Sequence, residues 1–398
     1  MGQGKGVHMS GNPSDQDTSN HCLAPSTAHP VVSVVMANFR GEAQLAAAMT
    51  SVLAQTEQRL ELIVCDDASD DDSVKIARRI AETDPRVHVI ASTRNEGPAA
   101  TRNKGLDSAR GEWISVVDSD DLIHPDRLAR LITAAKSAGA DLAADDLVYF
   151  GAMPEPQGRT LLQSMKLAAP MMLDPADYLR SNDGKSSLPA FGYLKPVIRR
   201  CALADQRYDT QLRIGEDHDL VMRLLIQGAR LLLLPDPLYA YRRHSGSISH
   251  RLSVSTVEAM LQAHRHLPPM PDPETRAAAK AVDRHLRRTL RYERLVSDIK
   301  ARRWLGLMPR LADPTMVARL MESLQDRHRR GTAHPRQDFA DLQQPLPFMP
   351  PAGEAWRSPP ADGAAQIASI SARGGCLPAN LPNWALWLFD ATAGSSTG

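Results

Sequence analysis

The sequence has no long apolar segment and almost no net charge. No window reaches the roughly 20 apolar residues that span a bilayer, and the first 30 residues carry no apolar stretch typical of a signal peptide. The formal net charge is +1 at pH 7, which points to no particular partner, and we expect no nucleic acid among them. We therefore expect a protein that is neither secreted nor integral to the membrane.

The sequence also lacks paired cysteines and a dinucleotide-binding glycine motif. Its four cysteines are widely separated and match neither C-x-x-C nor a zinc-ligand spacing. No G-x-G-x-x-G follows an apolar run, which argues against a dinucleotide-dependent oxidoreductase. The scattered cysteines favour a reducing cytoplasm.

What is present is the composition of a globular protein. Hydrophobic residues make up 42% of the 398 residues and charged residues 23%. This length predicts one large domain with an appendage. We expect a polar tail at 1–29, a catalytic domain at 30–250, a helical C-terminal unit at 251–332 and a Pro/Gly/Ala-rich tail at 333–398.

Short β-branched runs alternate with helical segments in the first part of the catalytic domain. This alternation is typical of βαβ units and a mostly parallel sheet flanked by helices. We predict strands at 31–36, 60–65, 87–91, 113–117 and 230–234, and helices at 44–55, 73–83, 99–109, 125–138, 216–228 and 273–303. Residues 139–213 look less regular. The pattern predicts an α/β fold whose ligands lie beyond the C-terminal ends of the strands.

The strongest chemical signal is the acidic run Asp118–Asp121, directly after an apolar run. A diphosphate leaving group gains negative charge as its bond breaks, and a divalent cation held by carboxylates neutralises that charge. Hard oxygen ligands favour Mg²⁺ or Mn²⁺. The alternative is that these residues cap the helix expected from Pro125. A second acidic pair, Asp66-Asp67, also ends a strand at the same edge of the predicted sheet, and capping alone would rarely require both.

A third acidic cluster, Gly215–Asp219, opens a predicted helix. A carboxylate there could accept the proton of an attacking hydroxyl, or it could cap the helix and interact with its dipole. The basic segment Tyr241–Ser247 could supply cations to phosphates, and a solvated basic loop is the alternative.

Taken in order, these segments resemble glycosyltransferase family 2, whose catalytic domain has the Rossmann-like GT-A fold. The resemblance covers roughly residues 31–250. The segments that carry it are Val32–Met36, Ser51–Thr56, Leu62–Asp71, Asn95–Asn103, Asp118–Asp121 with Pro125, and Gly215–Asp217. Within the family, the stretches 191–196 and 213–217 resemble bacterial exopolysaccharide transferases of the succinoglycan type, which extend a lipid-linked oligosaccharide at the cytoplasmic membrane face.

The resemblance implies roles for individual residues. Asp67 would bind the base of the nucleotide, Asp118 would lie near the ribose, and Asp120 would hold the metal. Asp217 would be the catalytic base of one in-line displacement that inverts the anomeric carbon. The other residues expected near the donor or the metal are Ala37, Asn38, Arg102 and His244. For Arg102 a place on the helix surface is an equally good interpretation.

The chain departs from the family pattern at two places. Phe39-Arg40 stands where most members have Tyr-Asn, and Ala37 stands where a small hydroxyl residue is common. The segment Lys300–Trp304 lacks the glutamine of the Q-x-x-R-W motif of processive synthases, which favours addition of a single sugar. The implied partners are a nucleotide-sugar donor, most of all a UDP-sugar, and a saccharide or lipid-linked saccharide acceptor.

Two other functions share parts of this pattern. A sugar nucleotidyltransferase should have a glycine-rich phosphate loop after the first strand, where this chain has Ala37–Glu42. A catalytically inactive assembly protein would not require Asp67, Asp120 and Asp217 together. Both alternatives are therefore less favoured than a transferase.

The segment 282–299 predicts a basic amphipathic helix. Such a helix can lie on an anionic membrane surface, which would place the enzyme peripherally on the inner face of the cytoplasmic membrane. The alternative is that its apolar stripe packs on the catalytic domain and its arginines face water.

Overall fold

The structure is a computed structural model that describes residues 29–151, 160–243, 252–303, 316 and 320–321. Its strands form one nine-stranded sheet in the order β3-β2-β1-β4-β8-β6-β9-β5, with β7 paired to β9. The strands are β1 (Val32–Asn38), β2 (Leu60–Asp66), β3 (Val87–Ala91), β4 (Trp113–Val116), β5 (Leu122–Ile123), β6 (Leu142–Gly151), β7 (Met171–Leu173), β8 (Val197–Arg199) and β9 (Leu231–Arg243).

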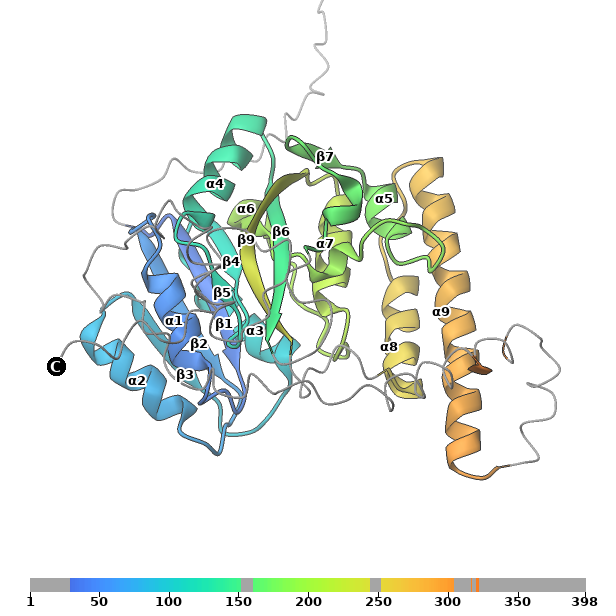
Figure 1. Cartoon of the computed structure of the whole chain (residues 1–398), viewed down its shortest axis with the longest axis horizontal. Helices are drawn as coiled ribbons and strands as arrows, with labels where there is room; N and C mark the ends of the chain where they lie inside the picture. Colours follow the sequence, from blue (N-terminus) through green and yellow to red (C-terminus); the bar gives the residue numbers. More distant parts are fainter. Residues whose placement is uncertain (1–28, 152–159, 244–251, 304–315, 317–319, 322–398) are drawn as a thin grey trace, which may run out of the picture.

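The helices flank this sheet on both sides, as Figure 1 shows. They are α1 (Leu45–Leu53), α2 (Ser73–Thr83), α3 (Pro98–Ser108), α4 (Arg127–Ala138), α5 (Pro175–Arg180), α6 (Arg200–Leu203), α7 (Glu216–Ile226), α8 (Val254–Arg265) and α9 (Pro273–Lys300). Two short 3-10 helices, η1 (Gln163–Met165) and η2 (Phe191–Tyr193), lie among the later strands. The helices α8 and α9 stand outside α7, at the right of the view.

The sheet combines parallel and antiparallel pairs. The strands β3, β2, β1 and β4 are parallel to one another, and so are the long strands β6 and β9. The short strand β8 joins these two groups by antiparallel pairing with β4 and β6. The predicted α/β fold with a mostly parallel sheet flanked by helices is confirmed.

The segment 139–213 is more regular than the sequence pattern indicates. It contains β6, β7, β8, α5 and α6, and β9 extends nine residues past the strand predicted to end at Leu234. Apart from the two-residue strand β5, which is not predicted, the elements before residue 139 agree with the predicted ranges within two residues. The short apolar runs therefore predict the first half of the sheet, and of the second half they predict only the beginning of β9.

Alternating side chains of the strands bury two cores, one on each face of the sheet. From β1, Val32, Val34 and Met36 pack with α1 and α4, and Val35 points to the opposite core with α5, α7 and α9. This period of two is the geometry of a strand covered on both faces. The strand ends are thereby held in place with their carboxyl termini at one edge.

The apolar stripe of α9 is buried and does not form an outer membrane-binding face. Val282, Leu286 and Leu290 belong to the same core as Leu220 and Leu224 of α7. The expectation that this stripe lies in a lipid interface is therefore wrong, because the stripe packs on the catalytic part of the chain.

The division of the chain into two units near residue 250 stays a prediction. Among the described residues, no helix combines the length and hydrophobicity that crossing a bilayer requires.

Candidate active site

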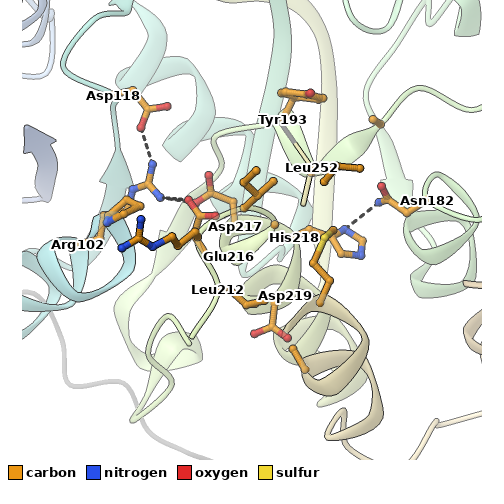
Figure 2. A pocket seen from close by; sticks show the side chains of 18 of the residues that line it. Arg102, Asp118, Asn182, Tyr193, Leu212, Glu216, Asp217, His218, Asp219 and Leu252 are labelled. Atoms are coloured by element: carbon orange, nitrogen blue, oxygen red, sulfur yellow. Dashed lines mark hydrogen bonds and ion pairs between the residues drawn. The ribbon is translucent and has the colours of Figure 1, made fainter. Parts of the chain in front are cut away.

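A cavity of about 620 Å³ lies beyond the C-terminal ends of β1 and β4. One wall is formed by the loop after β1, by α3 and by the segment Asp118–Asp120 after β4. The opposite wall comes from the start of α7 and from side chains of α8 and α9. Figure 2 shows Asp118, Arg102, Glu216 and Asp217 at one end of the cavity and His218 with Asn182 at the other.

Two glycines start the helices that carry the charged groups of this cavity. Gly97 precedes α3 with φ +89°, and Gly215 precedes α7 with φ +86°. Residues with a Cβ rarely adopt such φ values, so glycine permits each abrupt entry into a helix. As a result α3 presents Arg102, and the first turn of α7 presents Glu216 and Asp217, to the same space.

Arg102 is a buried cation at the centre of this end. Its guanidinium lies 2.7 Å from Asp118, 2.5 Å from Glu216 and 3.7 Å from Asp217. Its side chain is 7% exposed, which excludes the helix-surface interpretation. A buried arginine of this kind requires opposite charges around it, and here they come from two distant segments of the chain.

Lys195 is a second buried cation, and the sequence reasoning missed it. Its Nζ lies 2.8 Å from Asp118 Oδ2 and 2.7 Å from Asp217 Oδ2. A single ammonium thus links the carboxylate after β4 with the carboxylate on α7. Arg127, itself fully buried and paired with Asp145 at 2.8 Å, donates to the Lys195 backbone carbonyl and fixes this position from behind.

These contacts set the charge of each acid in the cavity. Burial would raise the pKa of Asp118 and Asp217, but Lys195 and Arg102 hold both pKa values below the usual range. Burial raises the pKa of Glu216 above its usual value despite its contact with Arg102. The two cations keep pKa values well above their usual ranges because the carboxylates outweigh the effect of burial. Asp118 and Asp217 are therefore stable as carboxylates.

The acidic run after β4 does not cap a helix. The N-cap of α4 is Asp126, and it makes no side-chain capping bond. Asp121 is buried, accepts hydrogen bonds from the Tyr239 hydroxyl at 2.8 Å and from the Arg242 amide at 2.6 Å, and has a raised pKa because of burial. Asp120 is partly exposed and lines the cavity. The run thus divides into an ion-paired Asp118, a cavity-facing Asp120 and a structural Asp121.

Asp67 has quite different partners from Asp118. Its two carboxylate oxygens accept hydrogen bonds from the backbone amides of Glu96 and Gly97, each at 2.8 Å, and it is 3% exposed. The residues that line the cavity do not include Asp67, Ala37 or Asn38. The cavity therefore brings together four of the predicted site residues: Arg102, Asp118, Asp120 and Asp217. The other three, Asp67, Ala37 and Asn38, lie outside the cavity lining, at the ends of β1 and β2. Their contact with a nucleotide stays a prediction.

The other end of the cavity is lined by neutral rings and apolar side chains. His218 stacks on Tyr178 with 4.9 Å between ring centroids, and its Nδ1 lies 3.1 Å from Asn182 Nδ2. Burial and nearby His264 lower the pKa of His218 to about 4, so the ring is neutral at physiological pH. Asp219, the other acid at the start of α7, pairs with Arg223 at 2.9 Å.

Asp120 is the acid to which the family resemblance assigns a metal. Its side chain is partly exposed and lines the cavity. Within the described ranges, no three His, Cys, Asp or Glu side chains are grouped closely enough to hold an ion by themselves. Mg²⁺ commonly uses one or two carboxylates together with substrate phosphates, and Asp120 in this cavity fits that arrangement. His244, the other expected ligand, lies outside the described residues.

Comparisons with known proteins agree with this geometry. A profile described as Glycosyl transferase family 2 matches residues 33–188. The chain is 35% identical over 301 residues to the succinoglycan biosynthesis protein ExoO of Rhizobium meliloti, covering 75% of this chain and 82% of that protein. It is 30% identical over 283 residues to ExoU of the same organism, covering 69% and 80%. The crystal structure of S. aureus TarS 1–349 in complex with UDP-GlcNAc matches with a TM-score of 0.52 at 20% identity, covering 64% of this chain and 71% of that chain, which supports the fold.

Proposed function

This chain belongs to glycosyltransferase family 2, enzymes that transfer a sugar from a nucleotide-sugar donor, and on that premise we propose that it adds one sugar to an acceptor hydroxyl with inversion. Its relatives are named for succinoglycan biosynthesis. The acceptor we propose is accordingly a lipid-linked saccharide in the assembly of an exopolysaccharide or another cell-surface polysaccharide.

One observation carries this proposal. The Lys195 ammonium touches both Asp118, at the end of β4, and Asp217, at the start of α7. The carboxylate expected at the donor and the carboxylate expected at the acceptor are therefore separated by a single charged group. Such proximity suits a displacement in which donor and acceptor react directly, because both must be held in near-attack geometry.

In this reaction Asp217 acts as the general base. Its carboxylate accepts the proton of the acceptor hydroxyl while that oxygen bonds to the anomeric carbon of the donor sugar. The bond from that carbon to the diphosphate breaks, and its electron pair leaves with the nucleoside diphosphate. One displacement inverts the anomeric centre, so no covalent intermediate on the enzyme is required.

On the donor side, Asp120 would bind a divalent metal together with the diphosphate. When bound, Mg²⁺ or Mn²⁺ would neutralise charge on the leaving group. Asp118 would orient the ribose, with Arg102 and Lys195 holding its carboxylate. Asp67, Ala37 and Asn38, which lie at the adjacent ends of β1 and β2, would hold the base, most of all uracil. The chain would then work as a metal-dependent transferase.

The place of work that we propose is the inner surface of the cytoplasmic membrane. Cations occupy the solvent-facing side of α9 at intervals of three and four residues: Arg276, Lys280, Arg284, Arg287, Arg291 and Arg294. At 100° per residue they fall within a sector of about 80°. We call this set the basic stripe. It offers electrostatic attachment to anionic lipids without insertion of the buried apolar side.

A release assay tests the proposed function. The purified protein with Mn²⁺ is given UDP-, GDP- and dTDP-sugars in turn, with free and lipid-linked saccharides as acceptors, and release of the nucleoside diphosphate is measured. We expect release from one donor class, dependent on the lipid-linked acceptor, and a product of inverted anomeric configuration by NMR. The proposal would be contradicted if none of the donors gave release, or if the product kept the anomeric configuration of the donor.

A further inference from the structure

Lys195 holds Asp217 in a state that opposes catalysis. Its ammonium is 2.7 Å from the carboxylate that must take a proton from the acceptor. A carboxylate stabilised by a bonded cation is a weaker base, because protonation must give up that interaction. The arrangement therefore stabilises the empty site and restrains the base at the same time.

The groups around Asp217 show which contact can be released. Arg102 faces it from α3, Asp118 from the end of β4, Glu216 from its own helix, and Lys195 from the segment before β8. The buried phenols Tyr178 and Tyr208 also face it. Arg102 is 3.7 Å away and is bonded more closely to Glu216 and Asp118. Of the two cations, Lys195 is the one bonded directly to Asp217.

Lys195 is suited to exchange partners. A lysine ammonium carries three N–H donors on a flexible stem, and the Lys195 ammonium contacts both Asp118 and Asp217. The residue lines the same cavity as Asp120, where the diphosphate is expected. Its backbone is held by Arg127, so the side chain can move while the main chain stays fixed. Lysine is also a common phosphate ligand.

We propose that Lys195 is a positioning residue that passes from Asp217 to the diphosphate of the bound donor, so that donor binding releases the catalytic base. This inference rests on the proposed function. The ammonium keeps its proton throughout, and the exchange makes and breaks only ion pairs. It predicts that the donor binds before a productive acceptor, because Asp217 is not free until the diphosphate is in place.

A double-mutant cycle on nucleotide binding tests the exchange. Binding of UDP with Mn²⁺ is measured by calorimetry for the wild type, Asp217→Asn, Lys195→Met and the double variant, with GDP and dTDP in parallel. If Asp217 competes with the diphosphate for the ammonium, Asp217→Asn should bind UDP about threefold to tenfold more tightly. Lys195→Met should bind it more weakly, and the gain from Asp217→Asn should disappear in the Lys195→Met background.

Glu216→Gln is the matched control, because it removes a neighbouring charge that contacts Arg102 and not Lys195. An equal gain from Glu216→Gln would mean that general repulsion explains the effect, and it would overturn the exchange. Unchanged UDP affinity of Asp217→Asn would overturn it as well, even if Lys195→Met fails to fold, because the amide is nearly isosteric. Failure of the proposed function would look different: the wild type would bind none of the three nucleotides and release none in the transfer assay.

Discussion

Asp67 follows β2 and Asp118 follows β4, so the two carboxylates lie at the same edge of the sheet, on either side of β1. They differ in the groups that bind them. Asp67 accepts hydrogen bonds from two backbone amides of the loop before α3, which ties that loop to β2. Asp118 is held by the side chains of Arg102 and Lys195. An ionised carboxylate has about four acceptor sites, so Asp67 can hold this loop and still accept from a base, whereas the charged side chains on Asp118 can be shared with a charged substrate. The position of an acid at a strand end therefore does not by itself show that it is catalytic, and its hydrogen-bond and ion-pair partners must be considered as well.

The largest effect should come from Asp217→Asn. An amide cannot accept the acceptor's proton, so kcat should fall about 10²-fold to 10⁴-fold, although the donor should still bind and should not bind more weakly than to the wild type. Glu216→Gln, which changes the adjacent acid bonded to Arg102, should cost less in kcat. Both are measured by steady-state kinetics with the donor found in the release assay. A greater loss of kcat for Glu216→Gln would assign the base to Glu216.

Asp120→Asn should come next. Losing the carboxylate that contacts the metal should cost several kcal/mol of leaving-group stabilisation, which is about 10²-fold to 10³-fold in activity at saturating Mn²⁺. Its thermal midpoint should stay near that of the wild type, because the side chain is partly exposed. The control is Asp121→Asn, whose buried hydrogen bonds predict lost stability. Asp120→Asn with activity within about threefold of the wild type would refute the metal role.

Asp67→Ala tests whether the hydrogen bonds of Asp67 stabilise the loop before α3. It leaves two partly buried amides without their acceptor, so the free energy of unfolding should fall by about 1–2 kcal/mol, as for hydrogen bonds to a charged group that are partly exposed. The matched control is Asp70→Ala, whose exposed ion pair with Arg40 should contribute less than about 1 kcal/mol. Both values come from urea unfolding. If Asp67→Ala proves as stable as Asp70→Ala, the loop is held by other contacts.

The same contrast explains what the sequence could predict of the fold. The strands β1 to β4 are short apolar runs bounded by turns, so the local sequence pattern is enough to predict them. The strand β6 was missed because Asp145 and Asp146 interrupt its apolar run. Both are buried, with Asp145 paired to Arg127 and Asp146 accepting from the Leu147 and Leu162 amides. Such compensation is set by distant residues and leaves no local period.

The site residues also differ in whether a local sequence motif predicts them. That Asp118, Asp120 and Asp217 share one cavity could be predicted, because acids after strands and at helix starts form recognisable local motifs. Lys195 was missed because its role depends on three segments that meet in space, and one lysine among 47 basic residues carries no local signal. One clue was available. Three acids expected in one cavity with a single Arg102 imply a second buried cation, although not which one.

His218 provides a smaller effect, on stability as a function of pH. Its pKa is lowered to about 4 by burial and by His264, against about 6.5 when unfolded. The unfolded chain therefore binds the proton first, and stability should decline as pH falls from about 6.5 to about 4, by at most about 3 kcal/mol. His218→Phe keeps a ring against Tyr178 and removes this titration. Thermal midpoints between pH 7.5 and 5 should fall less steeply for this variant than for the wild type. An equal slope would exclude His218 as the source.

The smallest effect concerns the basic stripe of α9, and it compares two exposed helical surfaces. Changing Arg284, Arg287 and Arg291 to Glu should release the protein from phosphatidylglycerol vesicles, because each cation near an anionic surface contributes about 1 kcal/mol. Wild type should sediment with vesicles at low salt and remain in solution at about 1 M salt, where the Debye length is about 3 Å.

The control changes three exposed cations on α2 to Glu: Lys75, Arg78 and Arg79. It alters the net charge equally, and so it should leave binding nearly unchanged if the stripe is the attachment surface. Equal loss in both variants would show that net charge, and not the stripe, governs attachment. Wild type that stays in the supernatant at low salt would remove the membrane from the proposal, since the apolar side of α9 is already buried in the core beside α5 and α8 and offers no second means of contact.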